Sequence, residues 1–196
     1  MTGYAVHSAF VRWGAPIVLV GGVLSTVGFR LGVERNVRAT FRRVGQRDYE
    51  SLLEQTAPSV LHVFPGDHAL GGTRYTRDSL RRWFERLFLL FPELHFEVKE
   101  VAVRGLPWDA TVMVQWENRG RACDGRPYAN QGTHVLRLRR GRVIYLHEYL
   151  DSQQVAAVCL RLARQGVSEA AAEPITDRRR PSPQALEAFE ECRPGK

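Results

Sequence analysis

The sequence predicts an α+β fold: a cone-shaped α+β barrel in which a curved antiparallel sheet wraps around three N-terminal helices. Two observations lead to this prediction. Apolar residues recur at helical spacing between residues 35 and 91, and alternation of apolar and polar residues takes over from residue 94 to residue 149. A curved sheet that covers helices leaves a cone with one open mouth, where pockets commonly form.

Sequence signals mark the ends of the three helices. The first runs from about Arg35 to Gly45, and Asp48 offers an N-cap oxygen to a short second helix. The third has the clearest boundaries, because Thr76 is a good N-cap and Pro92 cannot continue the helix. Its apolar face is expected to consist of Leu80, Trp83, Phe84, Leu87 and Phe91.

Five strands are expected around these helices. The first covers residues 59–64 and ends at Pro65-Gly66. The others cover residues 94–103 with a bulge, 110–118, 133–139 and 142–149. A tight turn at Arg140-Gly141 joins the last two strands, and Asp151 caps a further helix that begins near Ser152.

Length and composition fit one domain with extensions. The 196 residues, 44% of them hydrophobic, can bury one core. We assign residues 35–158 to the domain, residues 1–34 to a hydrophobic leader or membrane anchor, and residues 159–196 to a helical extension and a disordered tail. The 3 widely spaced cysteines exclude a disulfide scaffold and a Cys-x-x-Cys site, and they suit a reducing compartment.

The leader contains an uncharged segment. Residues 13–29 hold 17 uncharged residues, which is the lower length limit for a membrane-spanning helix. The arginines that follow, beginning with Arg30, would keep the domain in the cytoplasm. The alternatives are an extra helix packed on the domain and a leader without stable structure. The protein is therefore expected in the cytoplasm, either free or in contact with a membrane through residues 13–29.

The net charge of +7 does not by itself indicate nucleic-acid binding. Of the 28 basic residues, all except Lys99 and Lys196 are arginine, a skew that codon bias explains. The arginines are spread over the leader's flank, the turn at residues 139–142 and the tail rather than gathered in one groove with aromatic residues. No nucleic-acid partner is expected.

Four stretches in a fixed order carry a resemblance to a known family. They are residues 37–50, Phe64-Pro65-Gly66 with Gly71-Gly72, Asp124-Gly125-Arg126-Pro127-Tyr128-x-Asn130, and Gly141-Arg142-Val143 followed by Glu148-Tyr149-x-Asp151. Residues 35–158 resemble the SnoaL-like branch of the nuclear transport factor 2-like superfamily, to which ketosteroid isomerases and limonene epoxide hydrolases also belong. The resemblance implies the cone fold but no single function, since the superfamily includes isomerases, cyclases, hydrolases, ligand carriers and non-catalytic partners.

The resemblance also implies which side chains face into the cone. In an ungapped match to the epoxide hydrolases, Gln115 takes the position of an inward arginine and Glu117 that of an inward acidic residue. Glu148 takes the position of the second carboxylate in the pocket of those enzymes. His134 takes the position where ketosteroid isomerases keep an inward acid that donates to the substrate oxyanion. The candidate catalytic residues are Glu148, His134 and Glu117, because carboxylates in different environments can divide acid and base roles.

The same match gives substrate-binding candidates and shows departures from both enzymes. Phe64 stands where the isomerases carry their general-base aspartate, and Thr40 where they place an oxyanion-hole tyrosine, so their mechanism is disfavoured. His62 and Phe64 replace the water-holding tyrosine and asparagine of the epoxide hydrolases. The substrate-binding candidates are His62, Phe64, Asp67, His68, Trp83 and Gln115.

Two functions from different classes remain. The first is a cofactor-independent isomerase, cyclase or hydrolase that acts on a small hydrophobic or polycyclic molecule, and the second is a non-catalytic ligand-binding or protein-interaction module. Tyr145, His147 and Tyr149 have the opposite strand parity to Glu148, so we expect them on the outer sheet face, where members of the superfamily often form homodimers. No His-x-His or His-x-x-x-His spacing indicates a metal, and no cofactor is expected.

Overall fold

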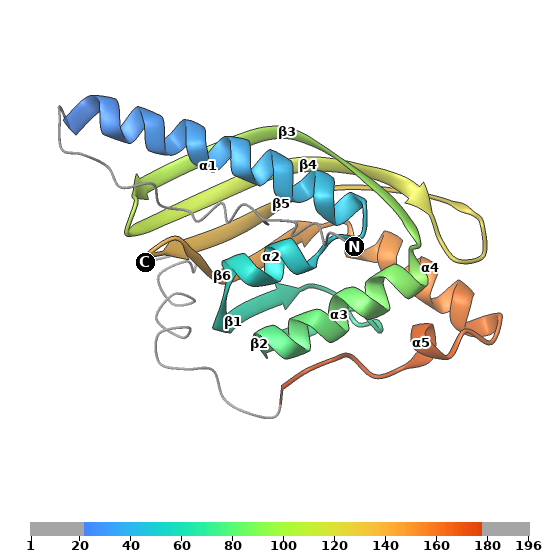
Figure 1. The fold of residues 1–196 in the computed structure, drawn as a ribbon. Helices are drawn as coiled ribbons and strands as arrows, with labels where there is room; N and C mark the ends of the chain where they lie inside the picture. Colours follow the sequence, from blue (N-terminus) through green and yellow to red (C-terminus); the bar gives the residue numbers. More distant parts are fainter. Residues whose placement is uncertain (1–21, 178–196) are drawn as a thin grey trace, which may run out of the picture.

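Helices cover one face of a single curved sheet (Figure 1). The computed structural model of the chain describes residues 22–177. The elements are α1 (Gly22–Gly45), α2 (Glu50–Gln55), β1 (Thr56–Phe64), β2 (Gly72–Thr76), α3 (Arg77–Leu90), β3 (Glu93–Leu106), β4 (Asp109–Arg121), β5 (Pro127–Arg139), β6 (Arg142–Leu150), α4 (Ser152–Arg164) and α5 (Ser168–Ala171). The strands lie in the order β2-β1-β6-β5-β4-β3. The predicted α+β fold is confirmed.

Two features of the sheet differ from the predicted cone barrel. β1 pairs with β6 in parallel, whereas the other neighbouring strands pair antiparallel, and the sheet is not closed, because β2 and β3 form its two edges. The parallel pair arises because α3 and the β3–β5 meander intervene before β6 returns beside β1. β2 is absent from the expected strands, since Gly72–Thr76 shows no apolar alternation.

Local signals in the sequence have the predicted structural effects. The Thr76 side chain accepts from the backbone N–H of Ser79 and caps α3, and Asp151 accepts from the N–H groups of Gln153 and Gln154 to cap α4. The β5–β6 turn has φ angles of 50° at Arg140 and 71° at Gly141. Positive φ at both central residues matches the twist of a hairpin.

Two hydrophobic clusters fill the space between the helices and the sheet. The first joins α2, α3 and α4 to the sheet and includes Leu53, Leu70, Trp83, Phe91 and Leu162. The second lies where α1 packs on the sheet and includes Val33, Val37, Val112, Val114 and Leu136. Val112 and Val114 of β4 and Leu136 of β5 occupy alternating inward positions of the strands, so their burial fixes which residues of these strands face the helices.

After α5 the chain returns to the start of α3 as an extended strap. The Asp177 carboxylate accepts from the backbone N–H of Tyr75 at 2.7 Å, from the N–H of Thr76 at 3.1 Å and from Ser79 Oγ at 2.6 Å. The Ile175 carbonyl accepts from Arg74 Nη1 at 3.3 Å. A carboxylate is favourable at this end of a helix, and the strap thereby covers the β2 edge of the sheet.

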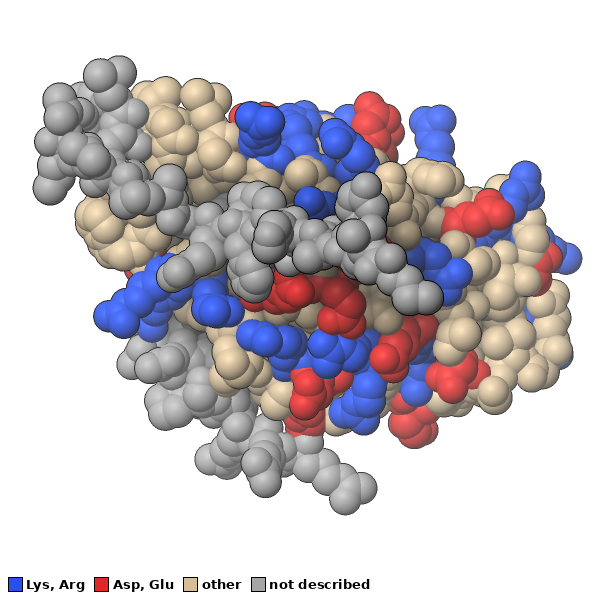
Figure 2. Space-filling model, in the orientation of Figure 1, with Lys and Arg blue, Asp and Glu red and all other residues tan. Residues whose placement is uncertain are grey.

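The uncharged segment 13–29 belongs partly to α1. Residues 22–29 form the first turns of that helix, and residues 13–21 lie outside the described residues, as does the tail beyond residue 177. Within residues 22–177, no helix is long and apolar enough to cross a membrane. Basic and acidic side chains are interspersed on the face shown in Figure 2.

Candidate functional site

A largely apolar cavity lies between the helices and the sheet. The space inside it that the centre of a water molecule can occupy is about 90 Å³. Since about 10 to 15 Å³ of such space holds one water, the cavity has room for a ligand of about one or two rings. The walls come from α1, α2, α3, α4 and the strands β1 and β3 to β6. The side chains with polar groups in these walls are Thr40, Gln55, Trp83, Trp116, Asn118, Tyr128, His134 and Glu148.

Four side chains on neighbouring strands form one hydrogen-bonded chain at this cavity. Arg74 Nε lies 3.0 Å from His62 Nδ1, and His62 Nε2 lies 3.0 Å from Glu148 Oε1. The other carboxylate oxygen, Oε2, lies 3.0 Å from His134 Nε2. Strand register brings the four together, because His62 stands opposite Arg74 and His134 opposite Glu148. The sheet therefore holds a chain that we call the Arg74–His134 relay.

The donors and acceptors of the relay fix its tautomers. Arg74 only donates, so His62 accepts at Nδ1 and carries its proton on Nε2, from which it donates to Glu148. The ionised Glu148 only accepts, so His134 donates from Nε2. When His134 is neutral, its lone pair is therefore on Nδ1. The described residues provide no hydrogen-bond partner for that nitrogen, and His134 lines the cavity.

Burial and neighbouring charges set the protonation states. Burial, reinforced by the Arg74 charge, lowers the pKa of His62 to about 4. Burial alone would raise the pKa of Glu148, but the neighbouring His134 and His62 outweigh it and lower that pKa. Burial also lowers the pKa of Arg74 to about 9, against the attraction of Glu148 and Asp177. Near neutral pH the relay thus holds a cation, a neutral His62 and a carboxylate.

These shifts make stability depend on pH. The pKa of His62 falls from 6.5 to about 4 on folding, so only the unfolded chain takes up its proton between these values. The His62 contribution is therefore fully present above pH 6.5, and about 3 kcal/mol of the free energy of unfolding is lost as the pH falls to about 4. Urea unfolding at pH 7 and pH 4 measures this loss. In His62→Gln the amide can accept from Arg74 and donate to Glu148 without titrating, so the free energy of unfolding should depend less on pH. An equally steep loss of stability in that variant would contradict the assignment of this loss to His62.

Comparison with known proteins places the chain in a family. The family model of the SnoaL-like domain matches residues 37–146, which is more than half of the chain. The chain belongs to the SnoaL-like domain family. Among curated proteins, none matches it significantly.

Solved structures share the fold of this SnoaL-like domain. An NTF2-like protein of unknown function from Burkholderia pseudomallei is 22% identical, with a TM-score of 0.57 over 64% of this chain and 95% of that one. PrhC from Penicillium brasilianum is 15% identical, with a TM-score of 0.61 over 72% of this chain and 94% of its own. TerC, co-crystallised with polyporic acid, is 18% identical, with a TM-score of 0.53 over 64% of this chain and 95% of its own. At these identities the likenesses show the fold alone.

The structure brings part of the predicted site together. Glu148, His134, Phe64 and Trp83 line the cavity, and the fully buried His62 lies behind Glu148. The proposed roles of these residues remain predictions, but their positions agree with an inward-facing site. Trp83 is also a core residue, since its Nε1 donates to the Leu70 carbonyl at 2.8 Å.

Two of the predicted loop residues lie away from the cavity wall. Asp67 is exposed, and His68 is half-buried with its ring 5.8 Å from that of Phe64. Burial lowers the pKa of His68, which favours its neutral form. Neither residue is among those that line the cavity of the SnoaL-like domain.

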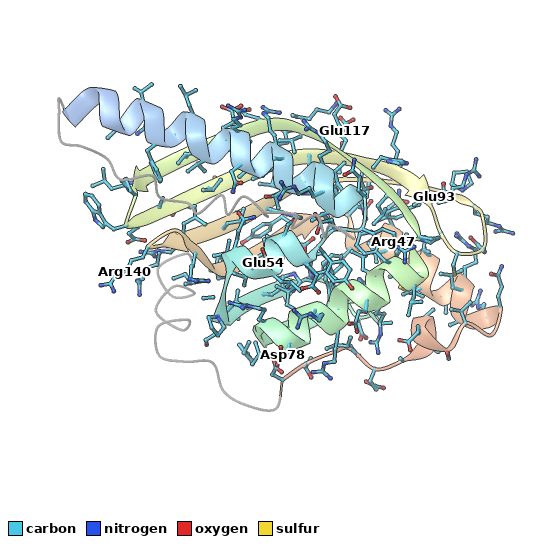
Figure 3. All side chains as sticks on the ribbon, viewed as in Figure 1. Arg47, Glu54, Asp78, Glu93, Glu117 and Arg140 are labelled. Carbon is cyan, nitrogen blue, oxygen red and sulfur yellow. The ribbon has the colours of Figure 1, made fainter. Side chains whose placement is uncertain are left out.

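The predicted inward positions of Gln115 and Glu117 are wrong. On β4 the buried residues are Ala110, Val112, Val114, Trp116 and Asn118, and Gln115 is exposed. Glu117 pairs with Lys99 at 3.1 Å and lies at the outer edge of the β3–β4 arch in Figure 3. The ungapped match shifts this strand by one residue, and a shift of one residue moves every side chain to the opposite face.

Sequence reasoning does not identify Arg74 as part of the site. Arg74 has no exposed surface and lies on β2, the strand that no apolar pattern reveals. Its position between Gly71-Gly72 and the Thr76 cap leaves only a few residues for an edge strand, which is the one clue in the sequence. On the outer face, Tyr149 is exposed and stacks on His147 at 4.0 Å, as expected from parity. The homodimer remains a prediction.

Proposed function

We propose that this SnoaL-like domain is a cofactor-independent enzyme that moves a proton on a small, neutral, largely apolar molecule. The observation that carries the proposal is the Arg74–His134 relay, in which Glu148 orients His134 and leaves Nδ1 for the substrate. A base that is oriented by a third group is the common arrangement in acid and base catalysis. Within the relay, His134 is the proton carrier and Glu148 positions it.

The proposed reaction is a shift of a proton, as in an isomerisation or a cyclisation. His134 Nδ1 removes a proton from carbon, and the electron pair of that bond moves into the substrate's own unsaturated system. The imidazolium that forms is stabilised by the Glu148 carboxylate 3.0 Å from Nε2. His134 then returns the proton to another atom of the substrate. No group in addition to the substrate is needed to balance this step.

The walls of the cavity support a neutral substrate. The lining is almost entirely apolar, and Glu148 places a negative charge inside it, which disfavours anions. TerC, a protein that shares this fold, is co-crystallised with polyporic acid, which supports a small organic molecule as the ligand. We therefore assign the cavity to a molecule of one or two rings.

The proposal is tested with nitrobenzisoxazole, a neutral bicyclic molecule whose ring opens when a base removes its carbon-bound proton. The wild-type protein should open the ring faster than buffer alone, because Nδ1 of His134 accepts the proton. His134→Gln should lower this rate by about 100-fold or more. His147→Gln is the matched control, because that histidine of β6 contacts Tyr145 and Tyr149 on the outer face. Equal rates in the two variants would contradict the proposal.

A further inference from the structure

Two side chains that line the cavity from β4 each carry a buried polar atom without a hydrogen-bond partner. Within the part of the chain that is described, Trp116 Nε1 and Asn118 Oδ1 are closed to solvent and have no partner. Trp116 is 2% exposed and Asn118 6% exposed, and both line the cavity. Buried polar groups in proteins are nearly always hydrogen-bonded, so an unpaired donor and an unpaired acceptor on one wall call for an explanation.

Other groups of the same type in this domain have partners. The indole N–H of Trp83 donates to the Leu70 carbonyl at 2.8 Å. The amide of Asn130 donates to the Tyr128 hydroxyl at 2.9 Å and to the Asp151 carbonyl at 3.0 Å. Among the buried tryptophan and asparagine side chains of residues 22–177, the lack of partners is therefore confined to β4. The other buried side-chain atoms without a partner belong to His68 and Arg77, which do not line the cavity.

The two unpaired residues lie beside the relay. Trp116 and Asn118 are two positions apart on one face of β4, about 7 Å along the strand. The Trp116 ring lies 5.2 Å from that of His134 and 5.6 Å from that of Phe96. A side chain at Gly132 would meet Cζ2 of Trp116 at 2.9 Å, so the absence of one there leaves room for the indole. The ring is therefore held next to the proposed proton carrier.

We propose that Trp116 and Asn118 form a subsite for the hydroxyl group of a neutral hydroxylated ring. The Trp116 N–H donates to the oxygen of the ligand, and the Asn118 carbonyl oxygen accepts from its O–H. A rotated Asn118 amide offers the same two functions, one donor and one acceptor. The carbon skeleton of the ligand lies against the apolar walls. This inference rests on the proposed function and adds the substrate class to it: a phenol or a ring alcohol with one polar end.

The subsite explains how the substrate is oriented as well as how it is bound. A ligand anchored by its hydroxyl group at β4 presents the adjoining carbon atoms to His134, whose ring touches Trp116. A ligand without the hydroxyl leaves both protein groups unpaired and loses affinity, because a site built to hydrogen-bond a polar group discriminates against an analogue that lacks it. Trp116 and Asn118 thus determine specificity.

Phenol and toluene test the subsite, because they have nearly the same shape and differ in a hydroxyl and a methyl group. In nitrogen–proton correlation spectra, phenol should move the Trp116 indole resonance downfield and toluene should not. The Trp83 indole, already bonded to Leu70, is the internal control. Trp116→Phe identifies the resonance by its disappearance.

Binding constants complete the test. The wild-type protein should bind phenol about tenfold more tightly than toluene, and Asn118→Leu should abolish most of this preference. Equal affinities in the wild-type protein, with a Trp116 resonance that phenol leaves unmoved, would overturn the subsite. That result would not affect the proposed function, which is judged by the rate at which His134 opens nitrobenzisoxazole.

Discussion

Replacing Arg74 with methionine is expected to lower the free energy of unfolding by about 3 to 5 kcal/mol. Arg74 has no exposed surface, and its guanidinium donates to His62 and to the carbonyls of Leu70, Gly71, Gly72 and Ile175. The variant leaves these acceptors without a donor, and it leaves Glu148 buried without the cation that balances its charge through His62. Urea unfolding at pH 7 measures the loss. The slope of the free energy of unfolding against urea concentration should be the same in the variant as in the wild-type protein.

Arg81→Met is the matched control for this prediction. Arg81 lies on α3 and pairs with Glu50 at 2.9 Å, but its side chain is 38% exposed. Ion pairs at this exposure contribute about 1 kcal/mol or less, so the control should be close to wild type. Arg74→Lys keeps the charge without the five donors of the guanidinium and should fall between the two. If Arg74→Met were no less stable than Arg81→Met, the relay would not hold the β2 edge in place.

The sequence is sufficient to predict the fold where local physical chemistry decides it. Thr76 caps α3, Asp151 caps α4, and Arg140-Gly141 turns between β5 and β6, as expected. Each of these depends on residues within one turn of chain. The apolar face of α3 is also correct, because helical spacing alone determines which of its residues can reach the sheet.

The candidate site depends on strand register, which local patterns determine less completely. β3 has a bulge between Val98 and Glu100, and β6 has another opposite residues 137–138. Both faces of β4 carry polar residues, so alternation does not distinguish Glu117 from Asn118 as the inward side chain. Glu148 and His134 are found from the sequence because the resemblance to the epoxide hydrolases and ketosteroid isomerases gives both of them inward positions, and both line the cavity. Arg74 is not found, since its partner His62 is fixed by tertiary pairing alone.

The relay joins stability to the proposed chemistry. The contacts that hold Arg74 also fix His62 as the tautomer that donates to Glu148. Glu148 in turn accepts from His134 with Oε2 alone, because its other oxygen, Oε1, accepts from His62. The strap at Ile175 contacts Arg74 directly, so a segment far along the chain contributes to the orientation of the site.

Glu148→Gln is expected to slow the opening of nitrobenzisoxazole by about 100-fold to 10,000-fold. In the native site both carboxylate oxygens accept, one from His62 Nε2 and one from His134 Nε2. Glutamine has one accepting oxygen and one donating NH₂ group. Because Arg74 keeps the proton of His62 on Nε2, the glutamine oxygen must face His62 and its NH₂ group must face His134. His134 then accepts at Nε2 and carries its proton on Nδ1, where the substrate needs a lone pair.

Glu117→Gln separates this tautomer effect from a general loss of negative charge. Glu117 is a glutamate on β4, which β5 separates from β6, and it pairs with Lys99 outside the cone, so its variant should retain the wild-type rate. Steady-state rates are compared for variants whose circular dichroism shows the native fold, with nitrogen-15 spectra of His134 reporting which ring nitrogen carries the proton. A Glu148→Gln protein with an unchanged rate, or one in which His134 keeps its proton on Nε2, would show that Glu148 does not set the base. A loss of rate in both variants would point to the net charge of the sheet rather than to the relay.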